Sequence, residues 1–262
     1  MTPGRLGPEV VGVLAPNPGP MTLTGTNTWV VGDPAETLPV VVDPGPPVPS
    51  HLETVLAAAG GRVGAVLVTH RHLDHTESAA TLAARVGCGV RAADPTWRVG
   101  PDGLAEGDEV ALGRARLEVL ATPGHTSDSV SLLLTGPSGV RLLTGDTVLG
   151  TGTSVISAPD GDLGAYLASL DRLLAVVQER EVISLLPGHG PVLGDPVTAL
   201  EHYREHRRQR LDQVRAARTA GAVTPEDVVA RVYPEVVGTP LQSAAVQSVR
   251  AQLEYLRRLD EG

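Results

Sequence analysis

The sequence predicts an α/β protein in which helices cover β-sheets in layers, followed by a smaller helical part. Short apolar runs bounded by Pro, Gly and Asp recur through the first 195 residues, and amphipathic helical patterns lie between some of them. No convincing strand pattern follows Pro196. We therefore expect a large domain at residues 1–195 and a small helical domain at residues 196–262.

The expected strands are short and rich in Val and Leu. They are Val10–Leu14, Asn27–Val31, Val40–Val42, Ala65–Val68, Leu117–Leu120, Val130–Leu134, Leu142–Leu143 and Val182–Leu185. The early strands are closely spaced, and helical patterns are mixed with the others. This order indicates a layered α/β sandwich.

The helices expected between these strands carry a capping signal or helical periodicity. Ser50 and Glu53 have the spacing of a capping box for a helix that runs to Ala59. Thr76–Arg85 and Leu163–Gln178 have the apolar pattern of two further helices.

The smaller domain should consist of helices only. Val197–Arg218 has the pattern of one long helix, whose apolar face is formed by Leu200, Tyr203, Leu211 and Val214. In Thr224-Pro225 and in Thr239-Pro240, an N-cap residue is followed by proline at the first helical position, so each pair predicts a helix start.

Composition limits the classes of protein that fit. A chain of 262 residues with 42% apolar residues can bury a sizeable core, and its net charge of −9 argues against tight nonspecific binding to nucleic acid. Cys88 is the only cysteine, so no internal disulfide can form. The first nine residues lack the apolar core of a signal peptide, and no apolar stretch approaches ~18 residues. We expect a cytoplasmic protein without a membrane span.

Side chains that bind metals gather at the ends of the apolar runs. Five of the eight histidines take part in this pattern. The ligand-type residues are His70, His72, Asp74, His75, His125, Asp146 and His189. Four of them fall within six residues, which is too close for one ion but suits two ions side by side. Imidazole and carboxylate ligands suit zinc, and also iron, manganese or nickel, and the lack of thiolates argues against a purely structural zinc.

The signature His-x-His-x-Asp-His, with a distant His, Asp and His, resembles the metallo-β-lactamase superfamily over roughly residues 10–195. The resemblance implies an αββα sandwich with two divalent metal ions at one edge of the sheets. We expect Zn²⁺, with Mn²⁺ or Fe as alternatives. The resemblance also implies that one ion is held by His70, His72 and His125. The second ion would be held by Asp74, His75 and His189, and Asp146 would bridge the two ions together with a hydroxide.

Two carboxylates have predicted supporting or catalytic roles. Asp43 ends a strand and resembles the acid that orients a liganding histidine in this family, although a simple turn residue is an equal alternative. Because zinc lowers the pKa of bound water to about 7, a metal-bridging hydroxide could attack a carbonyl carbon or a phosphorus. Asp74 is the candidate that orients this hydroxide or accepts a proton.

Two further segments are similar to the lactamase-beta-2-like branch, which includes an endoribonuclease that cuts single-stranded RNA. They are residues 17–29, which contain Asn27, and residues 205–214, which contain Arg207. We take both residues as candidate substrate contacts, with a buried acid as the alternative partner of Arg207. The tail from Thr224 resembles the small winged-helix-like domain of that branch, but the chain stops where its β wing would continue.

The sequence therefore predicts a binuclear metal-dependent hydrolase for an anionic or ester substrate. We expect a phosphodiesterase or endoribonuclease for single-stranded RNA. The alternative is a small-molecule thioester or ester hydrolase similar to glyoxalase II. A metal-stabilised binding protein and a one-iron oxygenase stay open as further alternatives. The apolar C-terminal helices could cover the catalytic domain or pair two chains as a homodimer, and no membrane partner is expected.

Overall fold

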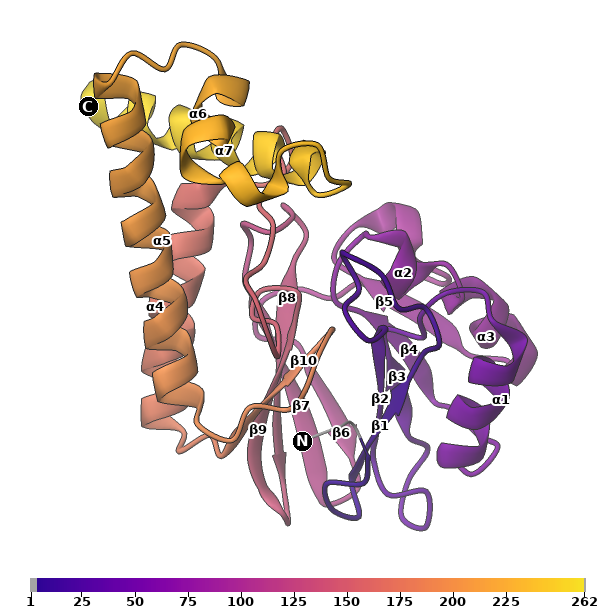
Figure 1. Cartoon of the computed structure of the whole chain (residues 1–262). Coiled ribbons are helices and arrows are strands. Elements are labelled where there is room, and N and C mark those ends of the chain that lie inside the picture. Colours follow the sequence, from indigo (N-terminus) through magenta and orange to yellow (C-terminus); the bar gives the residue numbers. More distant parts are fainter. Residues whose placement is uncertain (1–3, 262) are drawn as a thin grey trace.

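The computed structural model describes residues 4–261. Residues 1–3 and 262, at the outer ends of the two predicted domains, lie outside the described residues. Two five-stranded sheets pack face to face, helices cover both outer faces, and further helices follow at the C-terminal end (Figure 1). The predicted αββα sandwich with C-terminal helices is confirmed.

The first sheet contains the N-terminal strands in chain order. These are β1 (Val10–Leu14), β2 (Asn27–Val31), β3 (Val40–Val42), β4 (Ala65–Val68) and β5 (Gly89–Ala92). β1, β2 and β3 pair antiparallel, whereas β3, β4 and β5 run parallel. The associated helices are α1 (Pro49–Ala58), α2 (Leu73–Thr76), α3 (Ala79–Val86) and the short 3₁₀ helix η1 (Pro95–Trp97).

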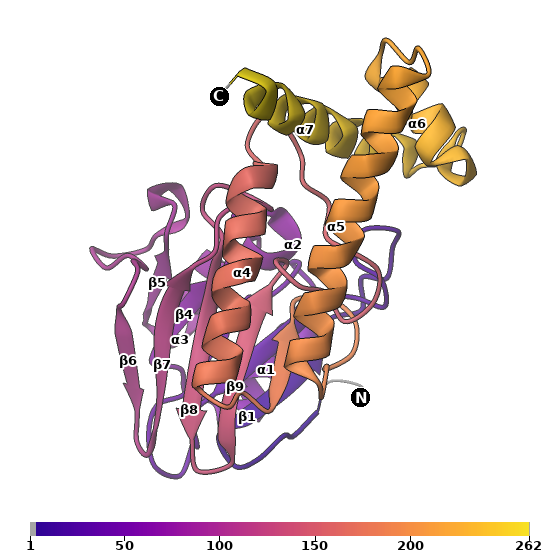
Figure 2. The same ribbon diagram turned by 90° about the vertical axis from the view of Figure 1, so that its left-hand side faces the viewer.

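The second sheet has the order β10-β9-β8-β7-β6. Its strands are β6 (Glu109–Leu112), β7 (Ala115–Ala121), β8 (Val130–Gly136), β9 (Gly139–Gly145) and β10 (Ser184–Pro187). Neighbouring strands pair antiparallel except β9 and β10, which run parallel because helix α4 (Leu163–Glu179) connects them. Figure 2 shows α4 lying across the outer face of this sheet.

The alternation of side chains along the strands separates three apolar clusters. Trp29 and Val31 of β2 point between the two sheets, while Val30 points outward to the cluster formed with α1 and α3. On the second sheet, Leu132 faces the first sheet and Leu133 belongs to the cluster under α4. Every face of both sheets is therefore covered by apolar packing.

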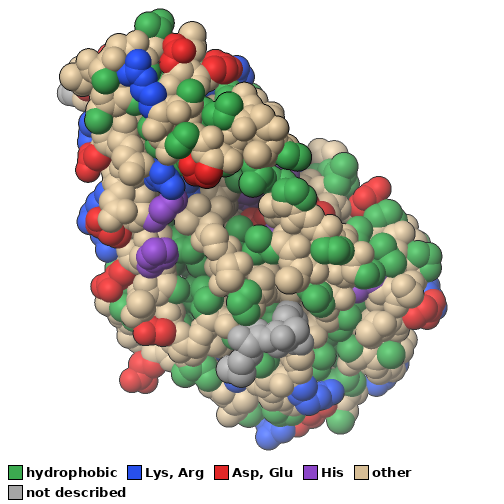
Figure 3. Space-filling model, in the orientation of Figure 1, with side chains coloured by type: hydrophobic (Ala, Val, Ile, Leu, Met, Phe, Trp, Pro, Cys, Tyr) green, Lys and Arg blue, Asp and Glu red, His purple; other side chains and the backbone are tan. Residues whose placement is uncertain are grey.

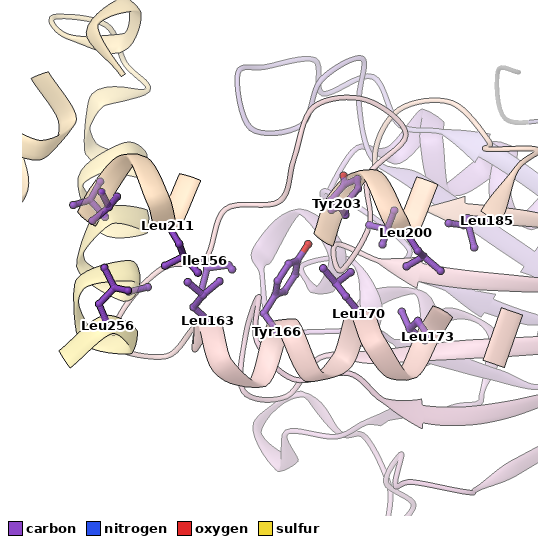
Figure 4. Packing of buried hydrophobic residues seen from close by; sticks show 14 of the residues in the cluster. Ile156, Leu163, Tyr166, Leu170, Leu173, Leu185, Leu200, Tyr203, Leu211 and Leu256 are labelled. Carbon is purple, nitrogen blue, oxygen red and sulfur yellow. The ribbon is translucent and has the colours of Figure 1, made fainter. Parts of the chain in front are cut away.

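The C-terminal helices extend the cluster under α4. They are α5 (Pro196–Thr219), α6 (Pro225–Val232), the 3₁₀ helix η2 (Pro234–Val236) and α7 (Gln242–Glu261). Figure 4 shows Tyr166 and Leu170 of α4 facing Tyr203 and Leu200 of α5, with Leu256 of α7 in the same cluster. Buried residues on both sides of position 196 share this cluster, so the domain boundary there stays a prediction.

Some predicted boundaries differ from the structure. Helix α1 begins at Pro49 with Val48 as an uncapped N-cap, so the predicted capping box is wrong. Its acid, Glu53, instead forms an ion pair with Arg85 of α3, at 2.6 Å between Oε1 and Nη1. The helix predicted at Thr76–Arg85 corresponds to α3, which begins three residues later at Ala79, and the short helix α2 before it was not predicted. Strands β5 and β6 were not predicted, and α7 begins at Gln242, two residues after Pro240.

Within residues 4–261, no helix is both long and apolar enough to cross a bilayer.

Candidate metal centre

The ligand-type residues converge because the strands that precede them end at one edge of the sandwich. β3 and β4 run parallel in the first sheet, and β7, β9 and β10 share one direction in the second. His70 follows β4, His125 follows β7, and Asp146 and His189 follow β9 and β10. Asp74 and His75 lie in α2, directly after the β4 loop.

The converging side chains form two adjacent groups whose ligand atoms could each hold a cation. The first group contains His70, His72, His125 and Asp146, and the second contains Asp74, His75 and His189. Within each group, the ligand atoms all lie within 4.8 Å of one another. The structure thus brings together all seven residues that the sequence predicts, and the six residues expected to bind one ion each fall into the two sets that the family resemblance implies.

In four histidines, the ring nitrogen that faces away from the centre contacts an oxygen atom. His75 Nδ1 lies 2.9 Å from Asp43 Oδ2, and His125 Nδ1 lies 2.6 Å from the carbonyl oxygen of Val155. The Nδ1 atoms of the other two rings contact Thr69 Oγ1 (His70, 3.1 Å) and Gly25 O (His189, 3.1 Å). Such contacts leave Nε2 of each ring free for a metal ion.

Asp43 forms hydrogen bonds both with the loop that follows β4 and with a histidine of the centre. It is buried and adopts a left-handed backbone, with φ of 51°, a conformation that aspartate tolerates. Its carboxylate accepts hydrogen bonds from Thr69 N at 2.8 Å and from Thr69 Oγ1 at 2.7 Å, in addition to its contact with His75. This geometry matches the supporting acid proposed from the sequence.

Asp146 lies between the two groups. Its Oδ2 lies 3.8 Å from His125 Nε2 and 3.4 Å from His189 Nε2, so one carboxylate contacts both groups. Its Oδ1 is buried without a hydrogen bond and lies 3.5 Å from His75 Nε2, so a positive charge beside it would be stabilising. Nitrogen atoms also face nitrogen atoms, with 3.0 Å between His125 Nε2 and His72 Nδ1. Bound cations would satisfy all of these atoms, so the residues fit the predicted metal ions.

The charges of the centre also suit cation binding. Burial lowers the pKa of His70, His72 and His125, that of His125 to about 4, so these rings are neutral at pH 7. Burial also lowers the pKa of His189, but Asp146 and Asp74 outweigh it and raise this pKa to about 9. A cation bound beside Asp146 would displace that proton.

A cavity of about 640 Å³ opens onto the centre. Its floor includes His72, Asp74 and Asp146, and its walls come from residues 20–23, residues 149–157, α5 and the start of α7. Figure 3 shows the surface hollowed between the C-terminal helices and the sandwich. The C-terminal helices therefore form part of the wall of the candidate site.

The two predicted substrate contacts differ in their position. Arg207 lines the cavity, but no carboxylate among residues 4–261 lies within ion-pairing distance of it, so the alternative of a buried acid partner is wrong. Asn27 is fully buried, does not line the cavity, and donates to Pro187 O at 2.9 Å and Gly190 O at 2.8 Å. We interpret Asn27 as a brace for the turn that carries His189.

The sequence analysis missed the segment after Asp146. Ser154 and Val155 contact His125, and Leu149 to Ser157 contribute to the cavity wall. The available signal was the run Gly-Thr-Gly-Thr-Ser at residues 150–154, which lies between a predicted ligand and a predicted helix. A polar, glycine-rich loop in this position is typical of a functional loop.

Replacing Gly188 with alanine should weaken cation binding. A Cβ atom at this position would lie 2.5 Å from Asp146 Oδ1 and 2.7 Å from His75 Cε1, so it would displace a ligand of each group. We expect zinc affinity, measured by chelator competition, to fall about 10–100-fold. Gly194→Ala is the control, because a Cβ there meets no atom within 4 Å. Unchanged zinc affinity in Gly188→Ala would show that Asp146 and His75 are not ligands in this arrangement.

The fold and the two ligand groups define an αββα protein with a candidate metal centre at the ends of its strands. Comparison with known proteins gives the family: residues 21–189 match the metallo-beta-lactamase superfamily, and this chain belongs to it. The members are generally hydrolases that bind divalent metals. The superfamily predicted from the sequence is confirmed.

Similar proteins extend the match over nearly the whole chain. A beta-lactamase-like protein 2 homolog of Caenorhabditis elegans is 31% identical over 266 residues, covering 96% of this chain and 85% of that protein. An atrochrysone carboxyl ACP thioesterase of Aspergillus chevalieri is 31% identical over 273 residues, covering 97% and 84%. The crystal structure of a beta-lactamase domain protein from Burkholderia ambifaria shares the fold, with a TM-score of 0.82, 23% identity and coverage of 99% and 88%.

Proposed function

We propose that this chain is a metal-dependent hydrolase of thioesters or esters that carry an apolar acyl group. The observation that supports this most is the lining of the cavity over the candidate metal centre. Its apolar side chains include Met21, Leu23, Leu149, Val155, Val236 and Leu241. Such walls favour an apolar group and exclude water from the reacting atoms. This proposal places the thioester alternative ahead of the RNA cleavage that the sequence favoured.

Part of the positive charge of the basic helix α5 is already paired with acidic side chains. Arg204 pairs with Asp171 at 2.6 Å, and Arg215 pairs with Asp212 at 3.0 Å. Burial, together with Arg207 and Arg210, lowers the pKa of His206 to about 4, so this ring is uncharged at pH 7. Affinity for nucleic acid depends on several cations that neutralise phosphates, and these observations reduce the charge that α5 can offer to them.

The similarity to the Aspergillus chevalieri thioesterase supports the same proposal. It extends over 97% of this chain and thus includes the C-terminal helices that line the cavity. The name of that protein describes cleavage of a thioester. We therefore propose a thioester bond as the target of this chain. The substrate comparison described below tests which acyl group it accepts.

The side chains at the cavity floor have separate roles in this proposal. Cations held by the two ligand groups would supply an activated water and stabilise negative charge on the substrate carbonyl oxygen. Asp74, whose side chain is 29% exposed, lies with Oδ2 3.1 Å from His189 Nε2 and faces the cavity. Its carboxylate can accept a proton from the attacking water and deliver it to the leaving thiolate.

Single-stranded RNA cleavage is the second candidate. The observation that favours it is the position of two arginines, Arg207 and Arg210, in the cavity wall. Arg210 stacks over the ring of Tyr233, 4.5 Å from its centroid, and a phosphate could bind to its exposed edge.

One metal-loaded preparation can separate the two candidates. The substrates are an aryl thioester of N-acetylcysteamine, S-lactoylglutathione and a short labelled single-stranded RNA. We expect kcat/KM for the aryl thioester to exceed that for S-lactoylglutathione at least about 10-fold, because the cavity wall is apolar. Asp74→Asn should lower this turnover about 100-fold or more while the circular dichroism stays unchanged. RNA cleavage without thioester turnover would overturn the proposal.

A further inference from the structure

Three buried polar side chains of α4 and α5 form hydrogen bonds with the segment that follows Asp146. The Tyr166 hydroxyl donates to Thr147 O at 2.6 Å. The Tyr203 hydroxyl accepts from Leu149 N at 2.7 Å and donates to Leu149 O at 3.2 Å. Arg207 Nη2 donates to Ser154 O. We call residues 147–155 the clamped segment. Figure 4 shows Tyr166 and Tyr203 facing each other from the two helices.

The clamped segment also contacts the first ligand group, through His125. Val155 O lies 2.6 Å from His125 Nδ1, and Ser154 Oγ lies 3.0 Å from the same nitrogen. The segment also begins directly after Asp146. Its main chain thus connects α5 to two candidate ligands, and Arg207 holds the residue that touches His125.

The environment of Arg207 sets it apart from the other arginines of α5. Only 4% of it is exposed, and its guanidinium lies 4.9 Å from the centroid of the Tyr166 ring. Its Nε is buried without a hydrogen-bond partner, and none of the described carboxylates pairs with it. Burying an arginine without a carboxylate partner costs free energy. Keeping the helix soluble does not explain this cost, so the residue must have another role.

We propose that Arg207 is a positioning residue for the metal centre. It fixes the main chain of Ser154 and Val155, so that their oxygens hold His125 with Nε2 directed at His72 and Asp146. The C-terminal helix α5 thereby sets the cation affinity of the group that contains His125. This role goes beyond the proposed function and holds for any substrate.

The variant Arg207→Met tests the proposal, because it removes the guanidinium and retains much of the side-chain length. Zinc affinity is measured by titration against a chromogenic chelator, with the full chain first freed of metal. We expect one of two zinc ions to bind about 10–100-fold more weakly, as for other residues that orient a ligand, while the second is unchanged. Arg208→Met, at the exposed neighbouring position, should bind zinc as the unaltered chain does.

Further variants separate positioning from substrate contact and from general stability. Arg207→Lys should recover part of the lost zinc affinity, because an ammonium can still donate to Ser154 O. Ser154→Ala, which removes one of the two oxygens near His125 Nδ1, should weaken the same zinc ion by a smaller factor. Arg207→Met with unaltered zinc affinity would overturn the proposal, whether KM rises or the melting temperature falls. If Arg207→Met does not fold, unaltered zinc affinity in both Arg207→Lys and Ser154→Ala would overturn it.

Discussion

Replacing Asp146 with asparagine should lower the affinity for both cations and suppress turnover, while the protein stays folded. The asparagine keeps the volume of the side chain but removes the negative charge that lies 3.8 Å from His125 and 3.4 Å from His189. Because this carboxylate contacts both ligand groups, we expect a loss of more than about 100-fold in zinc affinity, beyond the loss typical of residues that only orient a ligand. Elemental analysis after dialysis at a fixed free zinc concentration measures the result.

The variant His72→Ala provides the comparison. His72 Nδ1 lies 3.0 Å from His70 Nε2 and 3.0 Å from His125 Nε2, so this ring belongs to the first group. We expect His72→Ala to lose about one zinc ion per chain and Asp146→Asn to lose both. Two zinc ions retained by Asp146→Asn would show that Asp146 does not bridge the groups.

Strands β1 to β4 could be predicted to the residue because each one is a mostly buried and mostly apolar run bounded by turn residues. Strands β5 and β6 were missed because only two of four residues in β5, and one of four in β6, are buried. Their apolar signal is correspondingly weak. The capping box at Ser50 failed because Pro49 can start the helix and Arg85 takes the acid that the box requires.

The candidate ligands could be predicted because each is a metal-binding residue type at the end of an apolar run. The clamped segment could not. Tyr203 and Arg207 bind main-chain atoms of Leu149 and Ser154, and a main-chain partner has no sequence pattern of its own. Asn27 shows the converse error, since a polar residue near the site was taken for a substrate contact although its amide bonds to the turn at 187–190.

Removing the cations should lower the melting temperature by roughly 10–20 °C. A ligand that binds only the folded chain stabilises it by about 2.7 kcal/mol at a concentration 100 times its Kd, so two such sites contribute about 5 kcal/mol. For a chain of this size, each kcal/mol shifts the melting temperature by about 2–4 °C. Without cations, the buried Oδ1 of Asp146 makes no hydrogen bond and the nitrogens of His72 and His125 face each other at 3.0 Å.

Scanning calorimetry at pH 7.5, with and without EDTA, measures this difference, and added zinc should reverse it. Asp146→Asn is the matched control, because a chain that has already lost both ions has little further stability to lose. We expect EDTA to shift its melting temperature by less than about 3 °C, which corresponds to about 1 kcal/mol. A shift of the same size in both proteins would mean that EDTA acts elsewhere on the chain. Equal melting temperatures of the unaltered protein with and without EDTA would contradict cation binding by the buried histidines.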